Sequence, residues 1–485
     1  MLFNSIEYLV FLPIVVLAYY IIPSRCRYIW LLIVSYYFYM CWEPRYALLI
    51  AFSTVATYLG GMGLEFVKNN EESHSLYSKL IVIGMAIINL GILFFFKYFD
   101  WILANINNLF HKSIEMPFSI VLPIGISFYT FQTLSYIFDI YRGTSKAEKN
   151  LFRYALFVSF FPQLVAGPIE RTGDLLPQIN TLEKIRWNNN NVRNGLLLIL
   201  YGMFLKLVIA DRAAILVNNV FDNYFLYGFV ELTIAAVLFA IQILCDFNGY
   251  TIVARGSALL LGITLSDNFK QPYFAETIRD FWQRWHISLT SWFTDYLYIP
   301  LGGNRKGKLR RYINSMIVFS VSGLWHGAGW HYMIWGFLHG IYLNVNHICR
   351  TQMNKWRRQE TNHFSSHILR IGITFILTDI AWVFFRAASC KDAVLYFRQM
   401  LICFQKYSLL ELGLEWYEWI ILICAVIIML IVDFLHEKGI KIRERILEER
   451  IWFRWLIYLL LLWVVVLFGI YGAEYDASQF IYFQF

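Results

Sequence analysis

The chain has 485 residues, of which 59% are apolar and 15% are charged, and its formal net charge is +8. Soluble globular proteins are about 45–50% apolar and about 25% charged, so the composition excludes an ordinary soluble protein. The basic residues lie mainly in short loops between apolar runs, as the positive-inside rule requires of membrane proteins. We therefore expect an integral protein of the lipid bilayer with no nucleic-acid partner.

Apolar runs long enough to cross most of a bilayer core of about 30 Å recur along the chain. They lie at 7–22, 28–42, 46–66, 80–97, 118–141, 151–166, 193–211, 229–247, 330–348, 367–387, 416–434 and 451–472. The first run lacks the basic start and cleavage site of a signal peptide and is expected to remain as a helix. The pattern predicts an all-α polytopic membrane protein. With no repeat or linker, we expect a single domain over 1–485, with a catalytic core at 118–350.

Loop charges predict the orientation of the chain. Arg25 and Arg27 follow the first run, which places them inside and the N-terminus outside. Further Lys- and Arg-rich loops at 142–153, 305–311, 350–358 and 437–450 are all interpreted as cytoplasmic. One last helix then leads to an extracytoplasmic tail at 473–485. Both termini are therefore predicted to be extracytoplasmic.

The stretch 252–329 does not form clean spans. It interleaves apolar residues with Asp267, Lys270, Asp280, Arg284, His286, Asp295 and the Gly302–Gly303 turn. Non-helical backbone at membrane depth is tolerated only where it is buried in protein or lines a water-filled cavity. We expect re-entrant or interfacial helices around a cavity here.

His326 lies between glycines and two indoles, in the segment Ser320–Trp330. Burial disfavours a charged imidazole, and a neutral imidazole can take a proton from a hydroxyl as a general base. The alternative is a hydrogen-bonded histidine at the membrane boundary. A second imidazole, His286, is expected to share a helix with Asp280 and Arg284, which could pair at i, i+4. The alternative there is an amphipathic interfacial helix with aromatic anchors.

No metal or resident cofactor is expected. The intervals between His326, His331, His339 and His347 do not match H-x-x-x-H spacing. The seven cysteines are scattered, with no C-x-x-C pair. The sequence also lacks a P-loop and a G-x-S-x-G elbow.

Several longer motifs together indicate a family. They are Leu122–Gln132, Phe161–Pro168, Asp246–Tyr250, Asp280–Ser288, Asp295–Asn304 and Trp325–Gly327. On these motifs the chain resembles the membrane-bound O-acyltransferases, specifically the bacterial branch of alginate O-acetylation proteins and teichoic acid D-alanyl transferases. It departs at Thr251–Ile252, where that family often has Ser-Asp.

The resemblance implies a helical bundle around a central tunnel in a bacterial cytoplasmic membrane. It implies that His326 is the catalytic histidine and His286 the second histidine of the tunnel. The acyl donor would arrive from the cytoplasm and the acceptor from outside. Within the matching motifs we assign substrate binding to Trp325, Asp246 and Asn304.

Arg305 and the basic loop to Arg311 could attract the phosphates of coenzyme A. A solvated loop that sets topology is the alternative. The C-terminal residues Phe480–Phe485 look like the F-x-Y-x-x-F terminus of a small partner of D-alanyl transferases. By that likeness Tyr482 is a candidate acyl relay, with an interfacial aromatic anchor as the alternative.

The sequence therefore favours an O-acyltransferase that moves acetyl from acetyl-CoA, as a substrate, to an extracytoplasmic acceptor. Family resemblance alone implies an SGNH-type transferase partner and a polysaccharide acceptor. Two alternatives remain, namely D-alanyl transfer from a carrier protein and a non-enzymatic transporter or channel.

Overall fold

The structure of the protein is a computed structural model that describes residues 1–70, 76–114, 121–165, 167–356, 364–405 and 408–471. Of the side chains in these ranges, those of 350–356 and 364 are not described. Helices form all the regular secondary structure of the described ranges. In chain order they are α1 Ile6–Ile21, α2 Arg27–Met40, α3 Tyr46–Asn70, α4 Leu76–Phe110, α5 Ile126–Arg142, α6 Leu151–Ser159, α7 Phe161–Leu164, α8 Thr172–Asn180, α9 Asn189–Met203, α10 Asp211–Asp222, α11 Phe229–Leu260, α12 Ile278–Arg284, α13 Ile287–Phe293, α14 Lys308–His326, α15 Trp330–Trp356, α16 Phe364–Arg386, α17 Cys390–Ile402, α18 Trp416–Glu437, α19 Ile442–Glu448 and α20 Ile451–Phe468.

Within the described ranges, 7 helical segments are long and apolar enough to cross a membrane. They are Tyr46–Asn70, Leu76–Phe110, Asn189–Asp222, Phe229–Leu260, Ser365–Arg386, Trp416–Glu437 and Ile451–Phe468. Each coincides with an apolar run of the sequence, so the predicted all-α polytopic membrane fold is confirmed.

The other apolar runs form shorter or less apolar helices. The run at 7–22 becomes α1, which has 16 residues. The run at 151–166 divides into α6 and α7, because the chain leaves the helical conformation at Phe160. Pro162, at the start of α7, has no backbone N–H with which to continue the α6 ladder.

The chain divides into two compact units. Unit 1 comprises Met1–Ile199 and Thr251–Ser266, and unit 2 comprises Leu200–Tyr250 and Asp267–Phe485. The single catalytic domain expected over 1–485 stays a prediction.

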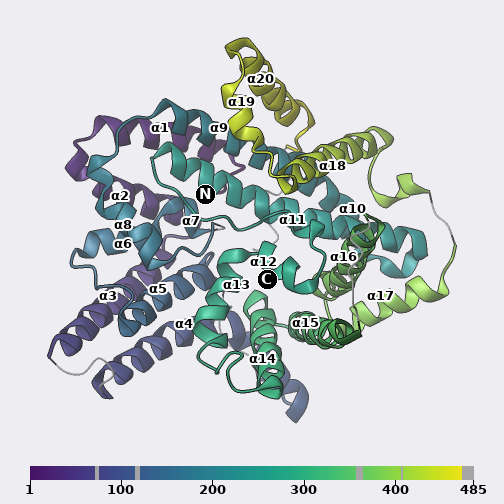
Figure 1. The fold of residues 1–485 in the computed structure, drawn as a ribbon, viewed down its shortest axis with the longest axis horizontal. Coiled ribbons are helices and arrows are strands. Elements are labelled where there is room, and N and C mark those ends of the chain that lie inside the picture. The colour runs from purple at the N-terminus through teal and green to yellow at the C-terminus, as the bar shows by residue number, and fades with distance from the viewer. Residues whose placement is uncertain (71–75, 115–120, 166, 357–363, 406–407, 472–485) are drawn as a thin grey trace. The chain divides into compact units, whose positions relative to one another are not determined.

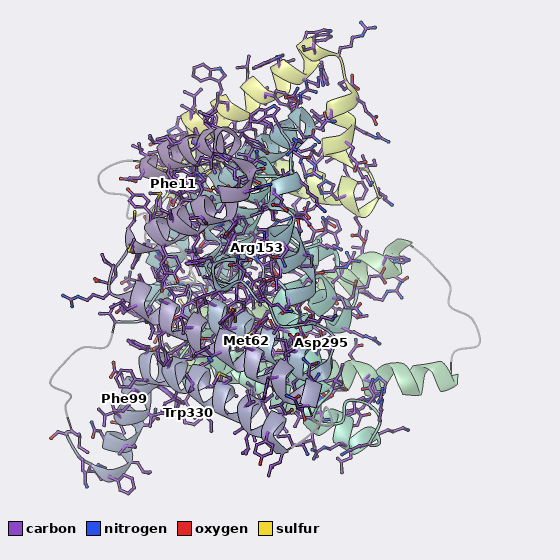
Figure 2. All side chains as sticks on the ribbon, turned by 90° about the vertical axis from the view of Figure 1, so that its left-hand side faces the viewer. Phe11, Met62, Phe99, Arg153, Asp295 and Trp330 are labelled. Atoms are coloured by element: carbon purple, nitrogen blue, oxygen red, sulfur yellow. The ribbon has the colours of Figure 1, made fainter. Side chains whose placement is uncertain are left out.

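Unit 1 has an aromatic cluster between its first helices. Phe11 of α1, labelled in Figure 2, lies with its ring centroid 5.9 Å from that of Phe38 and 5.3 Å from that of Phe161. In the same unit α3, α4 and α5 lie side by side (Figure 1). A buried hydrogen bond from Ser53 Oγ of α3 to Asn89 Oδ1 of α4 (2.6 Å) joins two of them.

Unit 2 contains most of the stretch 252–329, which was not expected to form clean spans. Residues 267–277 are largely non-helical, yet Asn268 and Phe269 are buried. The helices α12 and α13 that follow have 7 residues each. The stretch thus lacks clean spans up to α13, as expected, whereas re-entrant or interfacial helices around a tunnel stay a prediction.

Candidate active site

His326 is the last residue of α14, where this helix turns into α15 (Figure 1). Two glycines bring the helices together. A Cβ on Gly323 would lie 2.2 Å from the carbonyl oxygen of Tyr332, and one on Gly336 would lie 2.1 Å from that of Phe319. Since real atoms do not approach so closely, only glycine permits this packing, and the packing fixes the end of α14 that carries His326.

The surroundings of His326 are aromatic. Its side chain is 3% exposed, and its ring centroid lies 5.0 Å from Trp325, 5.1 Å from Trp335 and 5.4 Å from Phe385. Trp325 itself is 4% exposed. An imidazole among such rings has little water around it, which favours its neutral form.

The two predicted histidines lie together. His286 is fully buried, and its ring centroid is 6.3 Å from that of His326 and 6.1 Å from that of Trp325. Burial lowers the pKa of His286 to about 3, so this imidazole is neutral at physiological pH. Residues that are far apart in the sequence thus form one buried pair of imidazoles.

The helix expected around His286 is shorter than predicted. α12 ends at Arg284, and His286 follows it in a left-handed conformation (φ 42°, ψ 54°). The expectation that His286 shares a helix with Asp280 and Arg284 was therefore wrong. The left-handed residue interrupts the helix between α12 and α13.

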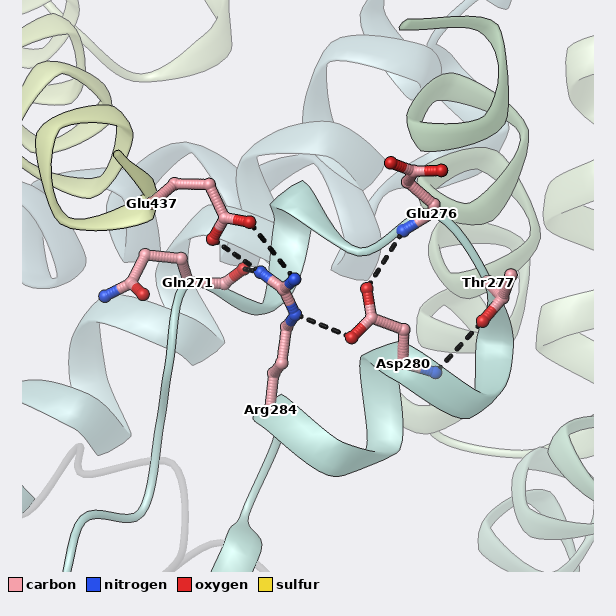
Figure 3. A network of polar contacts seen from close by, with 6 residues as sticks. All are labelled: Gln271, Glu276, Thr277, Asp280, Arg284 and Glu437. Carbon is pink, nitrogen blue, oxygen red and sulfur yellow. Dashed lines mark hydrogen bonds and ion pairs between the residues drawn. The ribbon is translucent and has the colours of Figure 1, made fainter. Parts of the chain in front are cut away.

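The predicted pair of Asp280 and Arg284 is present. Arg284 Nε lies 2.8 Å from Asp280 Oδ1, and its Nη1 lies 2.6 Å from Glu437 Oε2 at the end of α18 (Figure 3). Asp280 also accepts a hydrogen bond from the backbone N–H of Glu276 (3.2 Å). This network ties α12, which leads into His286, to α18.

Asp246, predicted to bind substrate, lies in a buried ionic cluster. Lys206 Nζ is 2.7 Å from Asp246 Oδ1 and 2.8 Å from Asp211 Oδ1, and the three side chains are 2–3% exposed. Lys206 belongs to a π-helical segment, Phe204–Ala210, between α9 and α10. The next residue after Asp246, Phe247, places its ring centroid 4.7 Å from that of His286.

The sequence prediction missed Lys206 and His339. Lys206 lies within the apolar run 193–211, where an ionisable residue is itself a signal of function. His339 is fully buried and accepts a hydrogen bond from Trp282 Nε1 at its Nδ1 (3.3 Å). Its i, i+4 spacing from Trp335 on α15 would have placed it on the face that carries the aromatic cluster.

Asn304 and Arg305 lie on an exposed turn rather than in the buried cluster. The predicted turn is present, because Gly302 and Gly303 both have positive φ (106° and 51°). Tyr482 lies outside the described residues. Shortly before the tail, the backbone N–H of Ile470 donates to the carbonyl oxygen of Leu207 (3.1 Å), next to Lys206.

Comparison with known proteins identifies the family. Residues 146–388, which contain both His286 and His326, match the model of the membrane-bound O-acyltransferase family. The chain belongs to this family. The resemblance drawn from the motifs is thereby confirmed, and the protein is an acyltransferase.

The relatives of this membrane-bound O-acyltransferase are named for several different acceptors. A peptidoglycan O-acetyltransferase of Helicobacter pylori is 35% identical over 425 residues, which cover 81% of this chain and 78% of the relative. A probable alginate O-acetylase of Pseudomonas aeruginosa is 36% identical over 426 residues, 85% of this chain and 77% of the relative. A teichoic acid D-alanyltransferase of Bacillus subtilis is 27% identical over 274 residues, 53% of this chain and 67% of the relative.

Proposed function

We propose that the protein transfers an acetyl group from acetyl-CoA to a hydroxyl acceptor, for O-acetylation of a cell-wall or exported polysaccharide. The observation that carries this proposal is the buried pair of imidazoles, His326 and His286, with ring centroids 6.3 Å apart. The names of the relatives support the acetyl group, since those matched over more than three-quarters of this chain are O-acetylating proteins.

His326 acts as the general base. It takes the proton of the acceptor hydroxyl while the oxygen forms a bond to the thioester carbonyl carbon. The carbon–sulfur bond then breaks, and the thiolate of coenzyme A leaves and recovers that proton. Trp325, Trp335 and Phe385 keep water from the imidazole, which limits wasteful hydrolysis of the thioester.

The basic loop beside α14 binds the phosphates of the donor. Arg305 lies on the exposed turn before α14. Burial raises the pKa of Tyr298, shortly before this turn, while the charges of Arg311 and Arg279 lower it, so both cations lie within electrostatic reach of Tyr298. Several cations near one turn suit a phosphate ester. Asn304, on the same turn, contributes to this end of the donor site.

Tyr482 supplies the acceptor hydroxyl from which His326 takes the proton, and it relays the acetyl group. The phenol oxygen accepts acetyl from the thioester, and the tyrosyl ester passes it to an extracytoplasmic transferase of the SGNH type. A phenolate is a good leaving group, which suits the second transfer. The proposal places the donor side in the cytoplasm and both termini outside the cytoplasmic membrane of a bacterium.

The test is acyl transfer by the purified protein in proteoliposomes with labelled acetyl-CoA, followed by intact-mass measurement. Wild type should release coenzyme A and carry label, and His326→Ala should do neither. Label on Tyr482→Phe equal to that on wild type would remove the tyrosine from the mechanism.

Two other outcomes would replace the proposal. Transfer from a D-alanyl carrier protein, with none from acetyl-CoA, would establish the other donor. Solute flux through the proteoliposomes without any release of coenzyme A would establish a transporter.

A further inference from the structure

His286 is held in a backbone conformation that residues with a Cβ rarely adopt. Its φ of 42° and ψ of 54° are left-handed, and such conformations persist only where the surroundings impose them. It also occupies the N-cap position of α13, but its side chain forms no cap hydrogen bond. Another group must therefore satisfy the first N–H groups of α13.

Asn268 supplies these hydrogen bonds from a distant part of the chain. Its backbone oxygen accepts from the N–H of Ile287 (2.9 Å). Its side-chain Oδ1 accepts from the N–H of Ser288 (3.2 Å) and from Ser288 Oγ (2.9 Å). Asn268 is 1% exposed, so it lies in the interior as a cap for α13.

The same oxygen contacts the imidazole. Asn268 Oδ1 lies 3.1 Å from His286 Nδ1. A backbone N–H can only donate, so the bond from Ser288 N identifies the shared side-chain atom of Asn268 as the oxygen rather than the amide nitrogen. An amide oxygen can only accept, and Nδ1 of His286 must therefore carry the proton.

We propose that Asn268 is a positioning residue that fixes His286 as the Nδ1–H tautomer, so that Nε2 is the hydrogen-bond acceptor presented to the substrate hydroxyl. This proposal rests on the proposed function for the use made of Nε2. With its proton on Nδ1, His286 presents a lone pair at Nε2 that orients the hydroxyl before His326 takes its proton. The opposite tautomer would present an N–H at Nε2, so the hydroxyl oxygen would accept a hydrogen bond instead of the hydroxyl donating one.

The electrostatic surroundings agree with a neutral ring. Burial lowers the pKa of His286, so protonation does not compete with the tautomer choice at physiological pH. Phe247 and Phe269, whose ring centroids lie 4.7 Å and 6.4 Å from that of His286, add apolar walls. The position of the single ring proton is then the property that Asn268 controls.

The substitution Asn268→Asp separates this role from a purely structural one. A carboxylate is a good cap acceptor, so α13 keeps its hydrogen bonds. The added negative charge beside Nδ1 favours the imidazolium, which places an N–H on Nε2. We expect acetyl transfer to fall by about tenfold relative to wild type at acidic pH, where the raised pKa leaves His286 as an imidazolium. The rate should recover as the pH is raised, since deprotonation restores the Nε2 acceptor. Ser291→Ala, on the same helix α13, is the matched control and should keep the wild-type pH profile.

The decisive measurement is nitrogen NMR of the full-length protein labelled with ¹⁵N-histidine, with the His286 signal assigned from its loss in His286→Gln. The proposal predicts a neutral ring with the proton on Nδ1 in wild type at pH 7, and an imidazolium that forms at a higher pH in Asn268→Asp than in wild type. A proton on Nε2 in wild type would overturn it, as would Asn268→Asp with an unchanged spectrum and pH profile.

Failure of the proposed function gives a different result. If His286→Gln transfers acetyl at the wild-type rate while the spectrum shows Nδ1–H, the tautomer assignment stands. In that case the use of Nε2 in catalysis is wrong.

Discussion

Helices α3–α5 of unit 1 and helices α12–α15 of unit 2 are packed by the same means but bury different chemistry. In both, glycines allow close approach. A Cβ on Gly61 would lie 2.6 Å from the ring of Tyr136, much as one on Gly336 would lie 2.1 Å from a backbone oxygen. The buried polar side chains of α3–α5 are all neutral amides and hydroxyls, whereas α12–α15 and their connections bury three imidazoles, His286, His326 and His339.

The buried polar groups of α3–α5 contribute to stability, whereas the buried imidazoles of α12–α15 are candidates for function. Neutral groups such as Ser53 and Asn89 satisfy each other by a hydrogen bond, so they stabilise a helix contact without a titratable group. Buried ionisable groups are candidates for function. Close helix packing is therefore a scaffold in both regions, and the proposed function places proton transfer in the second.

The largest effect should come from removing the proton acceptor. His326→Gln should lower the rate of acetyl transfer by about 10²–10⁴-fold, the usual contribution of general-base catalysis. Steady-state kinetics in proteoliposomes measure the rate, and circular dichroism should show an unchanged helix content. His331→Gln, on the same hairpin, is the control, and an equal loss in that variant would contradict the assignment.

Lys206→Met should cause the largest loss of stability. The substitution leaves Asp211 and Asp246 buried without their cation, and breaking a buried ion pair costs about 3–5 kcal/mol. The free energy of unfolding in detergent measures this cost. Lys441→Met is the matched control, because Lys441 pairs with Glu444 at the surface, and it should have no measurable effect. A small loss for Lys206→Met would mean that the cluster is not needed for folding.

Gly336→Ala tests the close packing beneath His326. The added methyl group must displace the Phe319 carbonyl, and overpacking of this kind costs about 1–3 kcal/mol. In contrast, Gly372→Ala on α16, where the new Cβ would meet nothing within 4 Å, should raise stability by up to about 1 kcal/mol. Thermal unfolding midpoints of the two variants should therefore move in opposite directions. A shift in the same direction would refute the packing argument.

The smallest effect is expected in unit 1. Asn89→Ala removes the acceptor of the Ser53 hydroxyl and should cost about 1 kcal/mol of stability. The rate of transfer per folded molecule should stay unchanged. A catalytic loss comparable to that of His326→Gln would mean that α3–α5 take part in the chemistry and would end the contrast between the two regions.

The sequence predicted the fold class for physical reasons, whereas the pairing of His286 with His326 came from the family resemblance. Apolar runs of spanning length form helices in a bilayer. Trp325 and His326 lie in a motif that combines aromatic rings with glycines, and the segment around His286 contains aromatic rings alone. Their burial followed from that context.

The remaining features depend on contacts between distant residues. Helical periodicity did not reveal that Asp246 pairs with Lys206, because the two lie 40 positions apart and meet through the packing of the π-helical segment. The start of α13 after His286 is capped by Asn268, which lies 20 positions before Ser288 in the sequence. Helix propensity depends on residues that are close in the sequence, so it cannot predict a hydrogen-bond partner that is distant in the sequence.

The most direct test of the central claim is rescue of His326→Ala by imidazole added to the medium. If His326 acts as the proton acceptor, a free imidazole in the vacated space should restore part of the transfer rate. It should not restore the rate of His326→Phe, in which a ring without nitrogen fills that space. No rescue of His326→Ala, or equal stimulation of both variants, would contradict the role of His326 as the general base.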